Sequence, residues 1–157
     1  MLKFCIEKWD KNKDRLRKDI ESNFEEYNNN SYDYLVKKVV DLIFNDEDGA
    51  SWEEFDSANI TEIDNGDCQG TLLYMIPRKT YQPSEYEYLM TYVGYGSCSG
   101  CDTLQAIQIW NIKDTSDEEK DKFTEDMIGL CLDIVQNTIK PYNYGWRSDE
   151  RFTVIES

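Results

Sequence analysis

The stretch YLMTYVGYGSCSGCDTLQAIQI, residues 88–109, sets the architecture, because one type of secondary structure gives way to another within it. Its first half is aromatic and β-branched, which is typical of a strand, here expected over 87–95. Gly94, Gly96 and Gly100 then permit a tight turn. Asp102 stands where it can cap a short helix over 102–109. A strand, a cysteine-bearing turn and a helix are therefore predicted in that order.

The segments before this stretch predict two helices and a hairpin. Apolar residues near a helical period predict a helix over about 8–26, and Ser31 is placed to cap a second one. Asn65-Gly66 lies between two β-rich runs, 60–63 and 71–76. Both residues tolerate positive φ, so this pair is a strong hairpin signal.

The segments after it predict a further helix. Thr115 and Glu118 form a capping box that opens a long amphipathic helix, and Pro141 closes it. Residues 152–155 alternate weakly and are expected to add an edge strand. This order of elements predicts one α+β domain over 1–157, with a small antiparallel sheet of three to four strands packed with N-terminal and C-terminal helices.

Charge is distributed unevenly along the chain of 157 residues, which carries a net charge of -15. Residues 41–70 hold ten acidic groups and no Lys or Arg, whereas basic residues crowd together between Lys8 and Lys18. A surface with this much negative charge repels phosphate, and direct binding to nucleic acid is therefore disfavoured. The acidic surface is suited to bind a basic groove on another protein, or its charge serves only to keep the chain soluble. The residues expected to make a protein contact are Asp46, Glu47, Asp48, Glu53, Glu54 and Asp56.

The absence of histidine removes much catalytic chemistry. Ser-His-Asp and Cys-His nucleophiles, His-containing zinc sites and imidazole switches are all excluded, which favours a binding protein over an enzyme. No run approaches the ~18 apolar residues of a membrane span, and the N-terminus lacks the apolar core of a signal peptide. A cytoplasmic protein with reduced cysteines is therefore expected.

Three interpretations of Cys98 and Cys101 remain open. They could bind zinc, the one cofactor that the sequence suggests, with Cys68 and Cys131 completing the site. They could exchange a disulfide, since the local strand–CxxC–helix order resembles thioredoxin-like proteins. They could also be small buried hydrophobes on a glycine turn, as is expected of Cys5 and of Cys131 if it is not a ligand.

The same turn could bind an anion. The backbone N–H groups of Ser99, Gly100 and Cys101, next to Asp102, could point at a small anionic or nucleotide ligand. Glycine turns with this potential are common, so the signal has low specificity.

The strings YEYLMTYVGYGSCSGCDTLQAIQ, ITEIDNGDCQGTLLYMIPRKTYQPS and MLKFCIEKWDKNKDRLRKDI, with LCLDIVQNTIKPYNYGW, together cover most of the chain. It resembles a family of small uncharacterised proteins of Firmicutes phages, prophages and related mobile elements, of which YGSCSGCDTL is the strongest marker. The resemblance implies an origin and no mechanism.

These features favour a phage-encoded binding protein that acts on a host component, such as a defence nuclease or effector, through an acidic face that imitates nucleic acid. A thiol or zinc protein that uses Cys98 and Cys101, and a binder of a small anionic or nucleotide signal, are the two alternatives.

Overall fold

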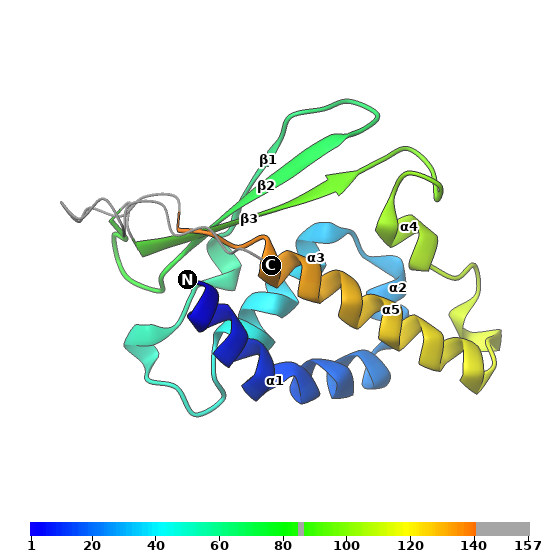
Figure 1. Cartoon of the computed structure of the whole chain (residues 1–157), viewed down its shortest axis with the longest axis horizontal. Helices are drawn as coiled ribbons and strands as arrows, with labels where there is room; N and C mark the ends of the chain where they lie inside the picture. The colour runs from blue at the N-terminus through cyan, green and yellow to red at the C-terminus, as the bar shows by residue number, and fades with distance from the viewer. Residues whose placement is uncertain (85–86, 141–157) are drawn as a thin grey trace.

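Three antiparallel strands form the sheet of the molecule, in the order β1-β2-β3. A computed structural model describes residues 1–84 and 87–140 (Figure 1). The strands are β1 (Thr61–Asp64), β2 (Gly70–Pro77) and β3 (Tyr88–Tyr95). Tyr74 of β2 lies opposite Glu62 of β1 and Thr91 of β3. The prediction of an α+β fold with a small antiparallel sheet is confirmed, with three strands among the described residues.

The two faces of the sheet differ because side chains alternate along a strand. On one face Tyr74, Ile76 and Val93 are buried in the hydrophobic core. On the opposite face Ile63 and Tyr92 are exposed.

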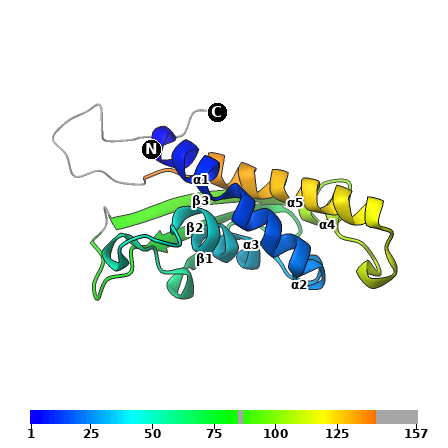
Figure 2. The ribbon, with the colours of Figure 1, turned by 90° about the horizontal axis from the view of Figure 1, so that it is seen from below.

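The helices lie together beside the sheet (Figures 1 and 2). They are α1 (Leu2–Ser22), α2 (Phe24–Asn29), α3 (Tyr32–Val39), α4 (Thr103–Ile107) and α5 (Asp117–Gln136). A π turn, η1 (Val40–Phe44), continues α3. Short 3-10 turns follow at η2 (Ser51–Glu53), η3 (Ser57–Asn59) and η5 (Ile112–Asp114).

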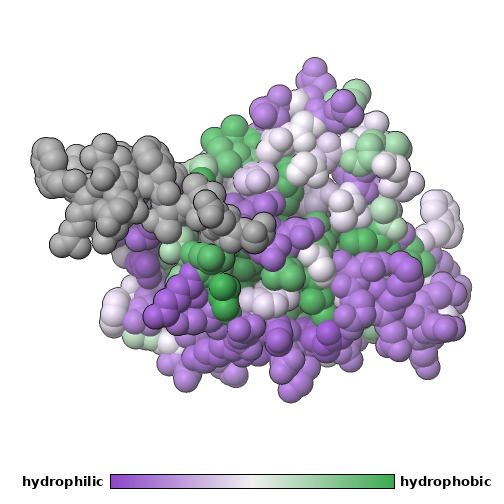
Figure 3. Space-filling view, viewed as in Figure 1, coloured by the Kyte–Doolittle hydropathy of each residue, from purple (hydrophilic) through white to green (hydrophobic). Residues whose placement is uncertain are grey.

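Helix α5 is fixed both to α1 and to the sheet. Helices α1 and α5 lie side by side and bury Leu16, Ile20 and Met127 between the elements of the core. Thr91 Oγ1 of β3 donates to the carbonyl of Ile134 in α5 at 2.7 Å. Because the apolar residues of these helices turn inward, hydrophilic side chains dominate the helical half of the face in Figure 3, and apolar side chains gather between it and the sheet.

The predicted first helix proves to be two helices. Helix α1 begins at Leu2 instead of near residue 8, and it ends at Ser22. The Asn23 side chain donates to the carbonyl of Asp19 at 2.9 Å, and its backbone departs from helical angles. Such a local side-chain hydrogen bond competes with the helical ladder, so the chain turns here before α2 begins.

The predicted hairpin is present, but positive φ does not form its turn. No described residue has positive φ. Instead Asp64 Oδ1 accepts from the N–H of Gly66 at 2.9 Å, and Asn65 Oδ1 accepts from the N–H of Thr71 at 2.7 Å. Aspartate and asparagine thus bend the chain through their side chains, and the loop spans residues 65–69.

The capping box of α5 is one residue later than predicted. Ser116, not Thr115, accepts from the backbone N–H three residues on, which is that of Glu119, at 3.2 Å. Helix α5 ends at Gln136, before Pro141. Pro141 and the strand expected over 152–155 lie outside the described residues. Over the parts of the chain that the structure describes, no helix has the length and apolar character to cross a bilayer.

The position of this cap can be tested with two alanine substitutions. Ser116→Ala removes an acceptor from the first turn of α5, and it is expected to lower the free energy of unfolding by about 0.5–2 kcal/mol. Thr115→Ala removes only the hydrogen bond from its hydroxyl to the carbonyl of Asn111, and its effect should be smaller. Urea denaturation measures both values. A larger loss of unfolding free energy for Thr115→Ala than for Ser116→Ala would mean that Thr115 is the cap, as the sequence predicts.

Candidate functional site

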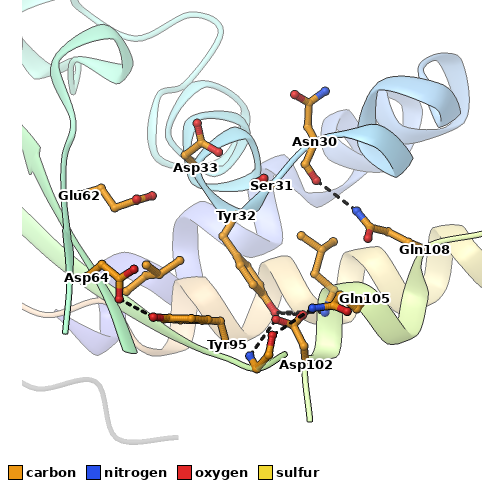
Figure 4. Close-up of a pocket in the computed structure, with 13 residues that line it drawn as sticks. Asn30, Ser31, Tyr32, Asp33, Glu62, Asp64, Tyr95, Asp102, Gln105 and Gln108 are labelled. Atoms are coloured by element: carbon orange, nitrogen blue, oxygen red, sulfur yellow. Dashed lines mark hydrogen bonds between the residues drawn. The ribbon is translucent and has the colours of Figure 1, made fainter. Parts of the chain in front are cut away.

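A cleft of about 510 Å³ opens where the start of α3, strand β1, the end of β3 and helix α4 converge (Figure 4). The lining residues are Asn30, Ser31, Tyr32, Asp33, Glu62, Asp64, Leu72, Tyr95, Gly96, Asp102, Leu104, Gln105 and Gln108. Four of them are carboxylates, and none is Lys or Arg. The cleft therefore presents negative charge and hydrogen-bond acceptors to a ligand.

Asp33, Glu62 and Asp64 lie together along one side of the cleft (Figure 4). Asp33 comes from the first turn of α3, where a negative charge is favourable. Glu62 and Asp64 lie two residues apart on β1, so both point to the same face of the sheet. These three carboxylates form the acidic side of the cleft.

Two tyrosines orient the carboxylates of β1. Tyr74 donates its hydroxyl to Glu62 Oε2 at 2.7 Å, and Tyr95 donates to Asp64 Oδ1 at 2.6 Å. The hydrogen bond from Tyr95, with that from the N–H of Gly66, lowers the pKa of Asp64, and the bond to Asp64 raises the pKa of Tyr95 to about 12. Both groups keep their ordinary charge at neutral pH, with Asp64 ionised.

Asp102 holds the other side of the cleft together. Its carboxylate accepts from the Tyr32 hydroxyl at 2.8 Å and from the backbone N–H groups of Gly96 and Gln105 at 2.9 and 3.0 Å. The Tyr32 hydroxyl accepts in turn from the N–H of Leu104 at 3.1 Å. Burial raises the pKa of Asp102, but these donors outweigh it and hold the pKa below its usual value. The predicted helix cap is confirmed, and a buried anion fixes the turn.

Cys98 and Cys101 are exposed, so the interpretation that they are packed hydrophobes is wrong. The turn folds back so that Cys101 lies over Gly96 and both thiols face solvent, with their sulfurs 3.1 Å apart. Cys5 and Cys131 are buried as predicted, and burial raises the pKa of each thiol to about 12.

The zinc site proposed for Cys98 and Cys101 finds no further ligands in the described ranges 1–84 and 87–140. No group of three or more cysteine, aspartate or glutamate side chains is placed there to hold a metal ion. Cys131 is buried on α5, and Cys68 is exposed in the loop between β1 and β2. Cys98 and Cys101 thus supply two soft sulfur ligands of the four that structural zinc takes.

The expected anion site at Ser99, Gly100, Cys101 and Asp102 faces an unfavourable environment. The N–H of Cys101 already donates to the carbonyl of Cys98 at 3.1 Å. The carboxylate of Asp102 takes the N–H of Gln105 in the first turn of α4 and the N–H of Gly96 after β3. The adjoining cleft is lined by carboxylates, which repel an anionic or nucleotide ligand.

Three of the six carboxylates in the acidic loop of residues 45–56 are paired with lysines elsewhere in the molecule. Asp46 contacts Lys8 at 2.7 Å and Lys11 at 3.2 Å, and Lys11 also contacts Asp48 at 3.2 Å. Lys8 and Lys11 of the basic run in α1 thus meet the acidic loop.

The remaining carboxylates of the loop differ in their contacts. Glu54 contacts Lys79 at 3.4 Å, and Asp56 caps η3. Glu47 and Glu53 are exposed and form no ion pair with another described residue. Several of the six residues predicted to contact a partner therefore already have contacts within the molecule, and fewer of these carboxylates are available to a partner than the sequence alone indicates.

The acidic side of the cleft was not found by sequence reasoning. Glu62 and Asp64 belong to the acidic stretch 41–70 but were not among the residues expected to contact a partner, and Asp33 is distant from both in sequence. One signal was available: Glu62 lies in the predicted strand 60–63 and Asp64 directly follows it, and residues two apart on an extended chain lie on one face. Nothing in the sequence indicates that Asp33 approaches that face.

No family model, curated protein or solved structure matches this chain.

Gly96 is required by close packing, whereas Gly100 is not. A Cβ at Gly96 would lie 2.6 Å from the carbonyl oxygen of Cys101, but one at Gly100 would come no closer than 3.8 Å to Cys98 Sγ. Gly96→Ala is expected to lower the free energy of unfolding by about 2–4 kcal/mol, and Gly100→Ala by less than about 0.5 kcal/mol. Thermal and urea unfolding of both variants checks this difference. Equal effects would mean that the turn does not pack on Gly96.

Asp46 is expected to make stability depend on pH. Its burial raises its pKa, but hydrogen bonds from Lys8, Asn12 and Lys11 outweigh this and hold the pKa well below its usual value. The folded state therefore binds fewer protons than the unfolded state near this pKa. The stabilisation by ionised Asp46 is present at neutral pH and is lost as the pH falls below about 4. Asp46→Asn should lower the free energy of unfolding by about 1–3 kcal/mol at pH 7. It should also make the fall of this free energy between neutral and acid pH less steep.

Asp48→Asn is the matched control for this substitution. Asp48 shares Lys11 with Asp46, but its side chain is 81% exposed. Its replacement should leave the free energy of unfolding close to that of the wild type. Urea denaturation across an acid pH series measures all three proteins. If the free energy of unfolding of Asp46→Asn falls with acid as steeply as that of the wild type, another carboxylate causes the loss of stability at low pH.

Proposed function

We propose that the protein is a binding module whose acidic cleft holds a cationic side chain of a partner protein. The observation that carries this proposal is the cleft itself, in which Asp33, Glu62 and Asp64 share one side and no lining residue is cationic. A concave site with a few convergent polar groups is the usual form of a binding site.

The remaining lining residues suit an arginine or a lysine. Leu72 and Leu104 supply apolar surface within the cleft, on which the aliphatic stem of a long basic side chain can lie. Glu62 and Asp64 are each held through one oxygen by a tyrosine, which leaves the second oxygen able to accept. A guanidinium group offers several donors in a fixed plane and suits such paired acceptors.

The partner that we propose is a host protein, in keeping with the phage resemblance. A basic nucleic-acid groove on a defence nuclease or effector presents the required cations, and the net charge of -15 steers such a surface toward this chain. The acidic loop then adds long-range attraction, whereas the cleft supplies the specific contact. This places the contact at Asp33, Glu62 and Asp64 instead of at Asp46, whose charge is used inside the molecule.

A peptide titration tests the cleft directly. The probe is a short peptide with blocked ends whose one charged group is a central arginine between leucines, and its control carries citrulline, which has the same shape without the charge. Titration by NMR should shift resonances of the cleft with the arginine peptide alone. Affinity should fall when salt rises from about 0.05 to about 0.5 M, because the Debye length shortens.

Two variants with the same change in charge locate the site. Asp33→Asn/Glu62→Gln/Asp64→Asn neutralises the acidic side of the cleft, and Glu47→Gln/Asp48→Asn/Glu53→Gln neutralises three groups of the acidic loop. The cleft variant should bind the arginine peptide at least about tenfold more weakly than the loop variant, a difference of ~1.4 kcal/mol. Equal weakening would attribute binding to net charge, and a weaker loop variant would move the site to the loop. Equal binding of the citrulline peptide would overturn the cationic ligand.

A further inference from the structure

The turn between β3 and α4 brings two thiols into contact at the surface. Cys98 Sγ and Cys101 Sγ are 3.1 Å apart, and both side chains are exposed. A disulfide bond is about 2.05 Å long, so the two sulfurs need to approach by only about 1 Å to bond. The backbone already closes the turn, since the N–H of Cys101 donates to the carbonyl of Cys98.

The other cysteines of the chain lack this arrangement. Cys5 and Cys131 are buried, and burial raises the pKa of both thiols, so they are poor nucleophiles at neutral pH. Cys68 is exposed, but it is in contact with no other thiol of the described residues. Cys98 and Cys101 are therefore the pair suited to exchange.

Cys101 is suited to attack first. Its pKa is lowered, chiefly because the Cys98 thiol can donate a hydrogen bond to its sulfur. A larger fraction of Cys101 is then thiolate at neutral pH, and the thiolate is the nucleophile in thiol–disulfide exchange. Cys98, in contact with it, is placed to act second.

A rigid frame holds Cys101 in this position. A Cβ at Gly96 would lie 2.5 Å from Cys101 Sγ, so the turn rests directly on the Gly96 backbone. Gly96 is itself fixed at both ends: its N–H donates to Asp102, and its carbonyl accepts from Gln105 Nε2 at 3.0 Å. The two cysteines thus lie on an anchored turn.

We propose that Cys98 and Cys101 form a redox-active dithiol that reduces a disulfide substrate. The Cys101 thiolate attacks one sulfur of the substrate, its S–S bond breaks, and the first substrate thiolate leaves as a mixed disulfide forms. Cys98 loses its proton and attacks Cys101 Sγ, which releases the second substrate thiolate. The substrate gains two electrons and, on protonation, two protons, and the protein holds one Cys98–Cys101 disulfide. This activity goes beyond the proposed binding function and does not depend on it.

Oxidised glutathione serves as the probe. The reduced full chain is incubated with mixtures of oxidised and reduced glutathione, quenched with acid, alkylated and analysed by mass spectrometry. A reversible loss of two hydrogen atoms, located to the peptide that holds Cys98 and Cys101, is expected. A pair that stays reduced in mixtures that modify Cys68 would overturn the proposal.

Single variants separate the two roles. Cys98→Ser should accumulate a mixed disulfide with glutathione on Cys101, because the second thiol is missing. In Cys101→Ser, the remaining thiol of the pair, Cys98, should react with oxidised glutathione at least about tenfold more slowly than Cys101 does in Cys98→Ser. Cys68→Ser is the control and should oxidise at the wild-type rate. Equal rates in Cys98→Ser and Cys101→Ser would contradict the assignment of Cys101 as the attacking thiol.

Two further measurements distinguish the dithiol from a metal site and from the cleft. Stoichiometric zinc in protein purified without chelator, lost in both cysteine variants and blocking oxidation, would replace the redox site with a metal site. The variant with a neutralised cleft should oxidise like the wild type. If the wild type fails to bind the arginine peptide but oxidises as expected, only the cleft is overturned; if it binds the peptide but Cys98 and Cys101 stay reduced, only the dithiol is overturned.

Discussion

The hydrogen bond between Tyr32 and Asp102 is the interaction that holds the site together. It joins the start of α3 to the turn before α4, across a sequence separation of 70 residues. Asp102 is buried, and a buried carboxylate is costly unless donors surround it. The hydroxyl of Tyr32 and the N–H groups of Gly96 and Gln105 supply those donors. One charge thereby fixes the end of β3, the start of α4 and one side of the cleft.

Ion pairing explains why the densest acidic run of the sequence is not the best candidate surface. The basic groups of α1 meet the acidic loop, so that Lys8 and Lys11 share Asp46. Charges that are satisfied inside the molecule contribute to stability, and they are less available to a partner. Glu62 and Asp64 at the cleft are instead oriented by tyrosines, which leave their charge unneutralised. The cleft therefore holds carboxylates that are paired with no lysine or arginine of the described residues, whereas Asp46, Asp48 and Glu54 of the acidic loop have counter-ions.

The dithiol and the cleft share a single structural support. Gly96 lines the cleft, and Cys101 packs closely against the same residue. Because Asp102 and Gln105 hold this segment at both its N–H and its carbonyl, the thiols lie on a fixed base while remaining exposed. The two proposed sites, the carboxylates that would bind a cation and the dithiol, thus depend on one buried anion.

Local elements could be predicted from the sequence: the strand expected over 87–95, the hairpin before it, the cap at Asp102 and the apolar face of α5 follow from residue type, side-chain period and capping chemistry. The ends of the helices were predicted less accurately, because polar side chains close in sequence compete for the same backbone groups. Asn23 ends α1 earlier than expected, and Ser116 instead of Thr115 caps α5. Which polar groups meet was visible only in the folded molecule. Asp33 reaches the face of β1, and the turn packs on Gly96 so that its thiols turn outward. Contacts between residues distant in sequence depend on how the elements pack, and periodicity within one element carries no information about its neighbours.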